Sequence, residues 1–125
     1  MKKLLFAFIA VCLVAAEGWA ASKSEDYELQ EACARRAKER FSQEFDSVRY
    51  AYQNHYNRKL NKCFIWVWSL NGARVQYLYD ANEKQDYGMI IIGLAQPKDF
   101  RCRILKKSCN SEAEWDAFIK PYMEE

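Results

Sequence analysis

The stretch Cys63 to Asp80, CFIWVWSLNGARVQYLYD, consists of two β-rich runs joined by Asn71-Gly72. Asn-Gly is the dipeptide preferred in a two-residue type I′ hairpin turn, and such a turn sets the register of both strands. The expected cross-strand pairs are Leu70 with Ala73, Trp68 with Val75, Trp66 with Tyr77 and Phe64 with Tyr79. One face of this hairpin is therefore expected to be almost wholly aromatic.

Two interpretations of the aromatic face are open. It lines a pocket or contacts a partner, since Trp and Tyr dominate interface hot spots, or it is core beneath the helices. We favour core, because a domain of roughly 100 residues must bury a hydrophobic face. The aromatic set is Phe64, Trp66, Trp68, Tyr77 and Tyr79. The more mixed set, expected to face solvent, is Ile65, Val67, Ser69, Arg74, Gln76 and Leu78.

A helix is predicted before the hairpin. Ser24 followed by acidic residues is a good helix start, and the helix is expected to run to about Asp46. Its apolar stripe recurs every four residues, at Leu29, Cys33, Ala37, Phe41 and Phe45. Residues 47–62 are ambiguous and are assigned to a short strand or irregular entry followed by a loop.

Two strands and a second helix are predicted after the hairpin. Tyr87–Ala95 is apolar on both faces, which favours a central strand, and Phe100–Leu105 is expected at the edge. Ser111 with an acid three residues later is a capping box, and Pro121 should end or kink the helix that follows. The apolar face of this helix comprises Trp115, Phe118, Ile119 and Tyr122. The fold class expected is α+β: an N-terminal amphipathic helix, a three- to four-stranded antiparallel sheet and a short C-terminal helix.

Residues 1–20, MKKLLFAFIAVCLVAAEGWA, are typical of an export signal. Two lysines precede the apolar run Leu4–Ala16, and Gly18 and Ala20 are small residues of the kind that signal peptidase recognises. The run is shorter than the ~20 apolar residues that span a bilayer. We expect cleavage after Ala20, with Gly18 as the alternative, and a single domain over residues 21–125. The expected location is periplasmic or secreted, with no stable membrane span after cleavage.

Cleavage would leave four cysteines, Cys33, Cys63, Cys102 and Cys109. An even number in a short exported chain predicts two disulfides, because the compartment is oxidising. Cys102 and Cys109 flank a short polar stretch that can close locally, which leaves Cys33 to pair with Cys63. Four cysteines allow three connectivities, so the other two stay open. The spacing lacks a Cys-x-x-Cys pair, and neither a metal nor a cofactor is expected.

Residues typical of catalysis are sparse. His55 beside Cys63 would form a base and nucleophile only with a free thiol, and no orienting partner or oxyanion hole can be assigned. A hydrolase using His55 is therefore the weakest alternative. The formal net charge is only +2, which does not indicate nucleic acid or an anionic membrane as partner.

Two basic clusters are either solvated faces or contacts for anionic envelope polymers or acidic protein patches. The first comprises Arg58, Lys59 and Lys62, and the second comprises Arg101, Arg103, Lys106 and Lys107.

The segments HYNRKLNKCF (55–64) and EWDAFIKPYMEE (114–125), with the spacing of Cys102 and Cys109, resemble small exported, cysteine-containing proteins of Gram-negative bacteria whose function is unknown. The resemblance covers those two stretches and the general layout. It supports the disulfide interpretation, and it implies no activity, cofactor or catalytic residue.

The sequence thus favours a small exported, disulfide-stabilised binding protein of the cell envelope, with no catalytic activity evident. We expect an envelope or extracellular protein or polymer as partner, no nucleic acid, and a monomer or weak dimer. The alternative is a small-ligand carrier in which a curved sheet and the first helix form an aromatic-lined cup. The candidate binding residues are His55, Arg58, Lys59, Trp66, Trp68, Tyr77 and Tyr79.

Overall fold

The computed structural model describes residues 2–83, 86–94 and 99–124, with side chains from residue 23 onward. The chain divides into two units, residues 1–31 and 32–125, which are described separately. Helix α1, Lys2–Glu44, forms the first unit and supplies the start of the second. Among the described residues, no helix has the length and apolar character needed to cross a membrane.

The predicted start of the first helix at Ser24 is wrong for this structure, because α1 begins at Lys2. Proline is absent between residues 2 and 44, and the residues before Ser24 are rich in Leu and Ala, which are strong helix formers. Ser24 therefore lies inside the helix. At the other end α1 stops at Glu44, two residues short of the expected Asp46.

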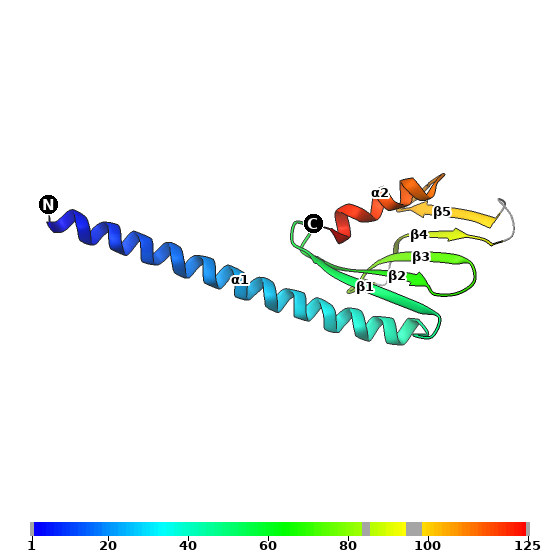
Figure 1. The fold of residues 1–125 in the computed structure, drawn as a ribbon, viewed down its shortest axis with the longest axis horizontal. Helices are drawn as coiled ribbons and strands as arrows, with labels where there is room; N and C mark the ends of the chain where they lie inside the picture. The colour runs from blue at the N-terminus through cyan, green and yellow to red at the C-terminus, as the bar shows by residue number, and fades with distance from the viewer. Residues whose placement is uncertain (1, 84–85, 95–98, 125) are drawn as a thin grey trace. The chain divides into compact units, whose positions relative to one another are not determined.

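The second unit is built on a six-stranded antiparallel meander (Figure 1). The strands, in both chain order and sheet order, are β1 Tyr50–Asn57, β2 Lys62–Ser69, β3 Arg74–Asp80, β4 Asp86–Ile92, β5 Phe100–Ile104 and β6 Lys107–Ser108. Helix α2, Glu112–Met123, follows. The α+β class is confirmed, but the expected three to four strands are too few. The additional strands come from the ambiguous residues 50–57 and from the two-residue β6 at the edge.

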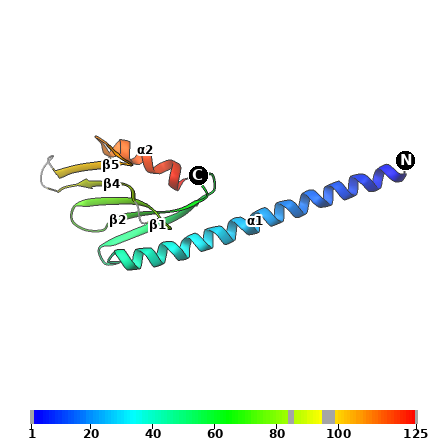
Figure 2. The ribbon, with the colours of Figure 1, turned by 180° about the vertical axis from the view of Figure 1, so that it is seen from behind.

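A helix covers each face of the sheet. In Figures 1 and 2 the sheet lies between α2 on one side and the C-terminal part of α1 on the other. The core of the α2 face comprises Phe64, Leu78, Ile90, Trp115, Ile119 and Met123. The core of the α1 face comprises Ala37, Phe41, Ile65 and Val67. Ala37 and Phe41 belong to the predicted apolar stripe of the first helix.

The predicted hairpin register is wrong by one residue. Trp66 lies opposite Leu78 instead of Tyr77, and Phe64 lies opposite Asp80 instead of Tyr79. Gly72 has a φ of 78°, but Asn71 is not in the left-handed region, so the chain does not form the expected type I′ turn. The hydroxyl of Ser69 accepts the N–H of Val75 at 3.0 Å, where a two-residue turn would continue the backbone ladder.

This shift divides the aromatic residues between the two faces, because a one-residue change of register exchanges the faces of a strand. Phe64, Trp66 and Trp68 share the α2 face with Leu78 and Gln76, whereas Tyr77 and Tyr79 lie opposite Val67 and Ile65 on the α1 face. The single aromatic face is therefore a wrong prediction. The expectation that Ile65 and Val67 face solvent is also wrong, since both are buried beneath α1.

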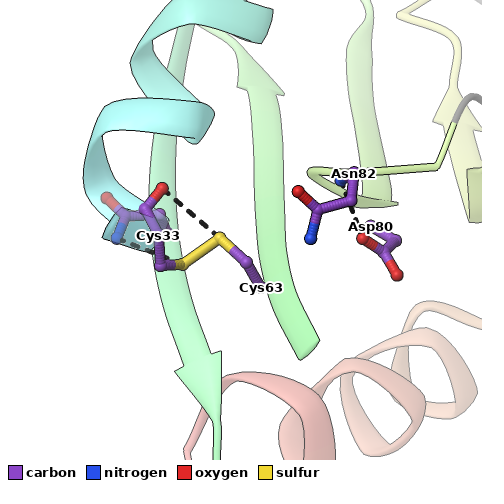
Figure 3. Close-up of a disulfide and its surroundings, with 5 residues drawn as sticks. Cys33, Cys63, Asp80 and Asn82 are labelled. Atoms are coloured by element: carbon purple, nitrogen blue, oxygen red, sulfur yellow. Dashed lines mark hydrogen bonds between the residues drawn. A yellow bond between two sulfur atoms is a disulfide. The ribbon is translucent and has the colours of Figure 1, made fainter. Parts of the chain in front are cut away.

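The two disulfides join Cys33 to Cys63 and Cys102 to Cys109, which matches the pairing expected from the sequence. Figure 3 shows the first bond connecting α1 to β2. Asn54 of β1 approaches this bond, with its Nδ2 3.9 Å from the Sγ of Cys33. The second bond joins β5 to the segment after β6.

Helix α2 begins as predicted, and of the two outcomes expected at Pro121, an end or a kink, it does not end there. The hydroxyl of Ser111 accepts the N–H of Glu114 at 3.1 Å, and the Glu114 carboxylate accepts the N–H of Asn110 at 3.0 Å. The helix then continues past Pro121 to Met123. Proline removes one N–H from the last turn, while the carbonyl of Pro121 accepts a hydrogen bond from Asn57 at 2.9 Å. This contact with β1 stabilises the end that proline weakens.

Candidate functional site

Trp66 and Trp68 form part of a shallow hollow, which we call the tryptophan hollow. Their ring centroids are 5.0 Å apart. The Oε1 of Gln76 accepts the indole N–H of Trp66 at 2.9 Å and that of the buried Trp115 at 2.8 Å. The hollow measures about 240 Å³ and is lined by Trp66, Trp68, Ser69, Arg74, Val75 and Gln76. This is below the ~300 Å³ at which small-molecule pockets usually begin.

Tyr77 and Tyr79 lie on the other face, in a half-buried aromatic cluster beside α1. The two rings stack with centroids 5.8 Å apart, and Phe45 contacts both at 5.9 and 6.0 Å. Burial, followed by the neighbouring Tyr77, raises the pKa of Tyr79 to about 12, against a partial opposing effect of Arg40. Tyr79 is thus neutral at physiological pH. Because it lies on the opposite face of the sheet, it cannot line a cup together with Trp66 and Trp68.

His55 lies on β1 opposite Phe64, on the α2 face. Its Nε2 is buried without a hydrogen-bond partner among the described residues. Cys63 pairs with Tyr56 and so projects to the opposite face, and its sulfur is bonded to Cys33. The base and nucleophile pair considered from the sequence is therefore not assembled.

A larger hollow lies where the β1–β2 turn meets the end of α2, and we call it the C-terminal hollow. It measures about 550 Å³, within the range of binding pockets, and has a mainly apolar surface. Its lining residues are Asn57, Lys59, Leu60, Lys120, Pro121, Tyr122 and Glu124. Of the candidate residues, Lys59 lines this hollow, whereas His55 and Arg58 do not.

Asn57 connects the two walls of the C-terminal hollow. Its side chain is only 1% exposed, donates to the Pro121 carbonyl at 2.9 Å, and accepts the Leu60 N–H at 3.0 Å. Leu60 itself is 48% exposed, although it is a large apolar residue. Burial, and then the neighbouring Tyr87, raises the pKa of Tyr122, so its hydroxyl is a neutral donor or acceptor. The hollow is thus preformed, with an accessible apolar side chain at its rim.

The sequence offered little signal for this hollow. Leu60 and Tyr122 are far apart in the chain. From the sequence, Asn57 is typical of a turn, and only the structure shows that its side chain donates to the Pro121 carbonyl. A strand that starts at Tyr50 brings Asn57 to the end of α2, and that strand was ambiguous from sequence.

The two basic clusters differ in how their charges are paired. Lys62 lies 3.5 Å from the buried Asp80 and 3.0 Å from Glu83, and it donates to the Tyr87 hydroxyl at 3.1 Å. The bonds to Tyr87 and Glu83 raise the pKa of Lys62. In the second cluster Arg103 pairs with Asp86, whereas Lys106 and Lys107 are exposed. Lys62 is therefore a structural residue, and the second cluster is the more accessible one.

Across the described parts of the chain, no group of three or more His, Cys, Asp or Glu side chains could bind a metal ion. Comparison with protein-family models finds no match, and comparisons with curated proteins and with solved structures find none either.

Proposed function

We propose that this chain is a small exported, disulfide-stabilised binding protein of the cell envelope, related to the exported Gram-negative proteins that its sequence resembles. Residues 1–20 act as a signal removed after Ala20, and the mature protein is periplasmic or secreted. The observation that carries the binding function is the C-terminal hollow, at about 550 Å³.

The hollow suits a protein or polymer partner better than an enclosed small ligand. It is an open depression whose rim carries Leu60 and Lys59, so an incoming surface can cover an apolar side chain and meet a cation together. Burying one leucine at an interface contributes on the order of 1.5–3 kcal/mol. Because Asn57 fixes both walls beforehand, little ordering entropy opposes binding.

The other two interpretations have less support. An aromatic cup needs Trp66 and Tyr79 on one surface, and they lie on opposite faces of the sheet. Hydrolysis through His55 needs a partner for its imidazole, and Cys63 is engaged in a disulfide on the other face.

Site-specific photocrosslinking in living cells tests the proposal. A photoreactive phenylalanine analogue at position 60 should give a discrete adduct with one envelope component. The same analogue at Val48, which is 74% exposed outside either hollow, is the matched control and should give none. Adducts at position 68 instead would assign binding to the tryptophan hollow, and equal labelling at positions 48 and 60 would contradict a specific site.

A further inference from the structure

Strands β5 and β6 form a tight hairpin with a distinctive sequence at its tip. Arg103 lies opposite Ser108 and Ile104 opposite Lys107, so Leu105 and Lys106 form the turn. The Cys102–Cys109 disulfide and a 3.0 Å bond from the Cys109 N–H to the Cys102 carbonyl close its base. We call residues 102–109 the basic hairpin. Its shape is thus fixed by covalent and hydrogen bonds.

The basic hairpin carries charge that the rest of the molecule does not neutralise. Lys106 and Lys107 are exposed, and no acidic partner for either exists among the described residues. Arg101, next to the hairpin, is likewise exposed and has no acidic partner among the described residues. Several basic side chains outside the hairpin have acidic partners, namely Arg40, Arg49, Lys62, Arg74 and Lys120, and within it Arg103 pairs with Asp86. The near-zero net charge of the chain conceals this local excess.

Leu105 at the tip combines an unusual backbone conformation with an exposed apolar side chain. Its φ is 54°, in the left-handed region that Gly or Asn adopts readily and that costs other residues stability. Two bonds maintain it: its N–H donates to the Tyr87 carbonyl at 2.7 Å, and its carbonyl accepts from Arg103 at 2.8 Å. Yet its side chain is 49% exposed, so packing within the described fold offsets little of the free energy lost to the left-handed backbone. Strained residues of this kind often mark functional sites.

We propose that the basic hairpin docks on the surface of an anionic lipid bilayer. Leu105 enters the boundary between headgroups and acyl chains, while Lys106 and Lys107 contact lipid phosphates. A soluble polyanion would need only the cations. The exposed Leu105 beside them is what favours a bilayer. This inference rests on the proposed envelope location, but it does not depend on the C-terminal hollow.

Vesicle flotation measures this docking directly. The exported protein, with its N-terminus established by mass spectrometry, is floated with vesicles containing phosphatidylglycerol or with phosphatidylcholine alone. Wild type should bind the anionic vesicles, and high salt should release most of it. Lys106→Gln with Lys107→Gln should weaken binding about tenfold to thirtyfold, since each lysine near such a surface contributes on the order of 1 kcal/mol.

Matched variants separate the basic hairpin from other causes. Arg35→Gln with Arg36→Gln makes the same change in net charge on the exposed side of α1 and should alter binding less than twofold. Leu105→Asn keeps both lysines and tolerates the turn, and should weaken vesicle binding several-fold. If the Lys106 and Lys107 variant binds like wild type, or if neutral vesicles bind equally well, the proposal is overturned. If Leu105→Asn has no effect and inorganic polyphosphate displaces the vesicles, the hairpin recognises a soluble polyanion instead.

Discussion

Gly72 is in the left-handed region in the turn between β2 and β3, whereas Asn71 before it is not. A Cβ at position 72 would meet nothing within 4 Å, so Gly72→Ala changes the backbone preference alone. We expect it to lower the free energy of unfolding by about 1–2 kcal/mol in a denaturant melt. Asn71→Ala, the matched control, should stay within about 0.5 kcal/mol of wild type. Equal losses of unfolding free energy at both positions would indicate that Asn71 also adopts the left-handed conformation, as in a type I′ turn.

Tyr79 should make stability fall at alkaline pH. Burial holds its pKa in the folded state at about 12, against an ordinary 10.0, so only the unfolded chain loses the phenol proton between these values. The stabilisation is complete below pH 10 and is lost as the pH rises toward 12. Denaturant melts across this range should show a steeper decline for wild type than for Tyr79→Phe. Parallel pH curves would contradict the assignment.

Between elements, the lack of a side chain at Gly88 of β4 makes room for Trp115 and Phe118 of α2. An alanine Cβ there would lie 2.7 Å from the Arg103 carbonyl oxygen and 3.0 Å from the Trp115 ring. Either β5 or α2 must shift, and overpacking of this kind costs about 1–3 kcal/mol. Gly88→Ala should lower the unfolding free energy and perturb the near-UV circular dichroism of Trp115. A variant with an unchanged near-UV signal and wild-type stability would mean that α2 does not pack here.

The sequence predicted which segments form helices and strands better than how they pair. The capping box at Ser111 and the apolar stripe through Cys33 and Ala37 are local signals, and the structure contains both. The β2–β3 register is not local in that sense. A loop longer by one residue changes the expected pair Trp66–Tyr77 into the observed pair Trp66–Leu78, and Asn-Gly is compatible with both loop lengths. That single residue reassigned Tyr77 and Tyr79 to the other face.

The candidate site was predictable only in part for the same reason. Lys59 was singled out by sequence, but half of the lining of the C-terminal hollow comes from the end of α2, which is distant from Lys59 in the chain. The contact of Asn57 with Pro121 depends on the long edge strand β1, whose alternation of aromatic and polar residues was masked by turn-forming asparagines. Side-chain pairs that meet only after folding leave no spacing in the sequence to detect.

For the domain as a whole, the two disulfides should contribute unequally to stability. Cys33 and Cys63 are separated by 30 positions, whereas Cys102 and Cys109 are separated by only 7. On the chain-entropy estimate, replacing the first pair by alanine should cost about 3–4 kcal/mol and replacing the second about 2–3 kcal/mol. Denaturant melts of the two double variants under oxidising conditions measure both. A larger loss for the shorter loop would show that contacts around Cys109, rather than loop length, determine the cost.

The connectivity also bears on how the protein would mature. The four cysteines of the proposed mature chain pair in sequence order. The first, Cys33, bonds to the second, Cys63, and the third, Cys102, bonds to the fourth, Cys109. A chain translocated N-terminus first into an oxidising compartment would present the first pair before Cys102 emerges. A thiol oxidase that couples cysteines in order of arrival would therefore generate the native pattern directly. Biogenesis should accordingly require the oxidase and proceed at a normal yield in cells that lack a disulfide isomerase.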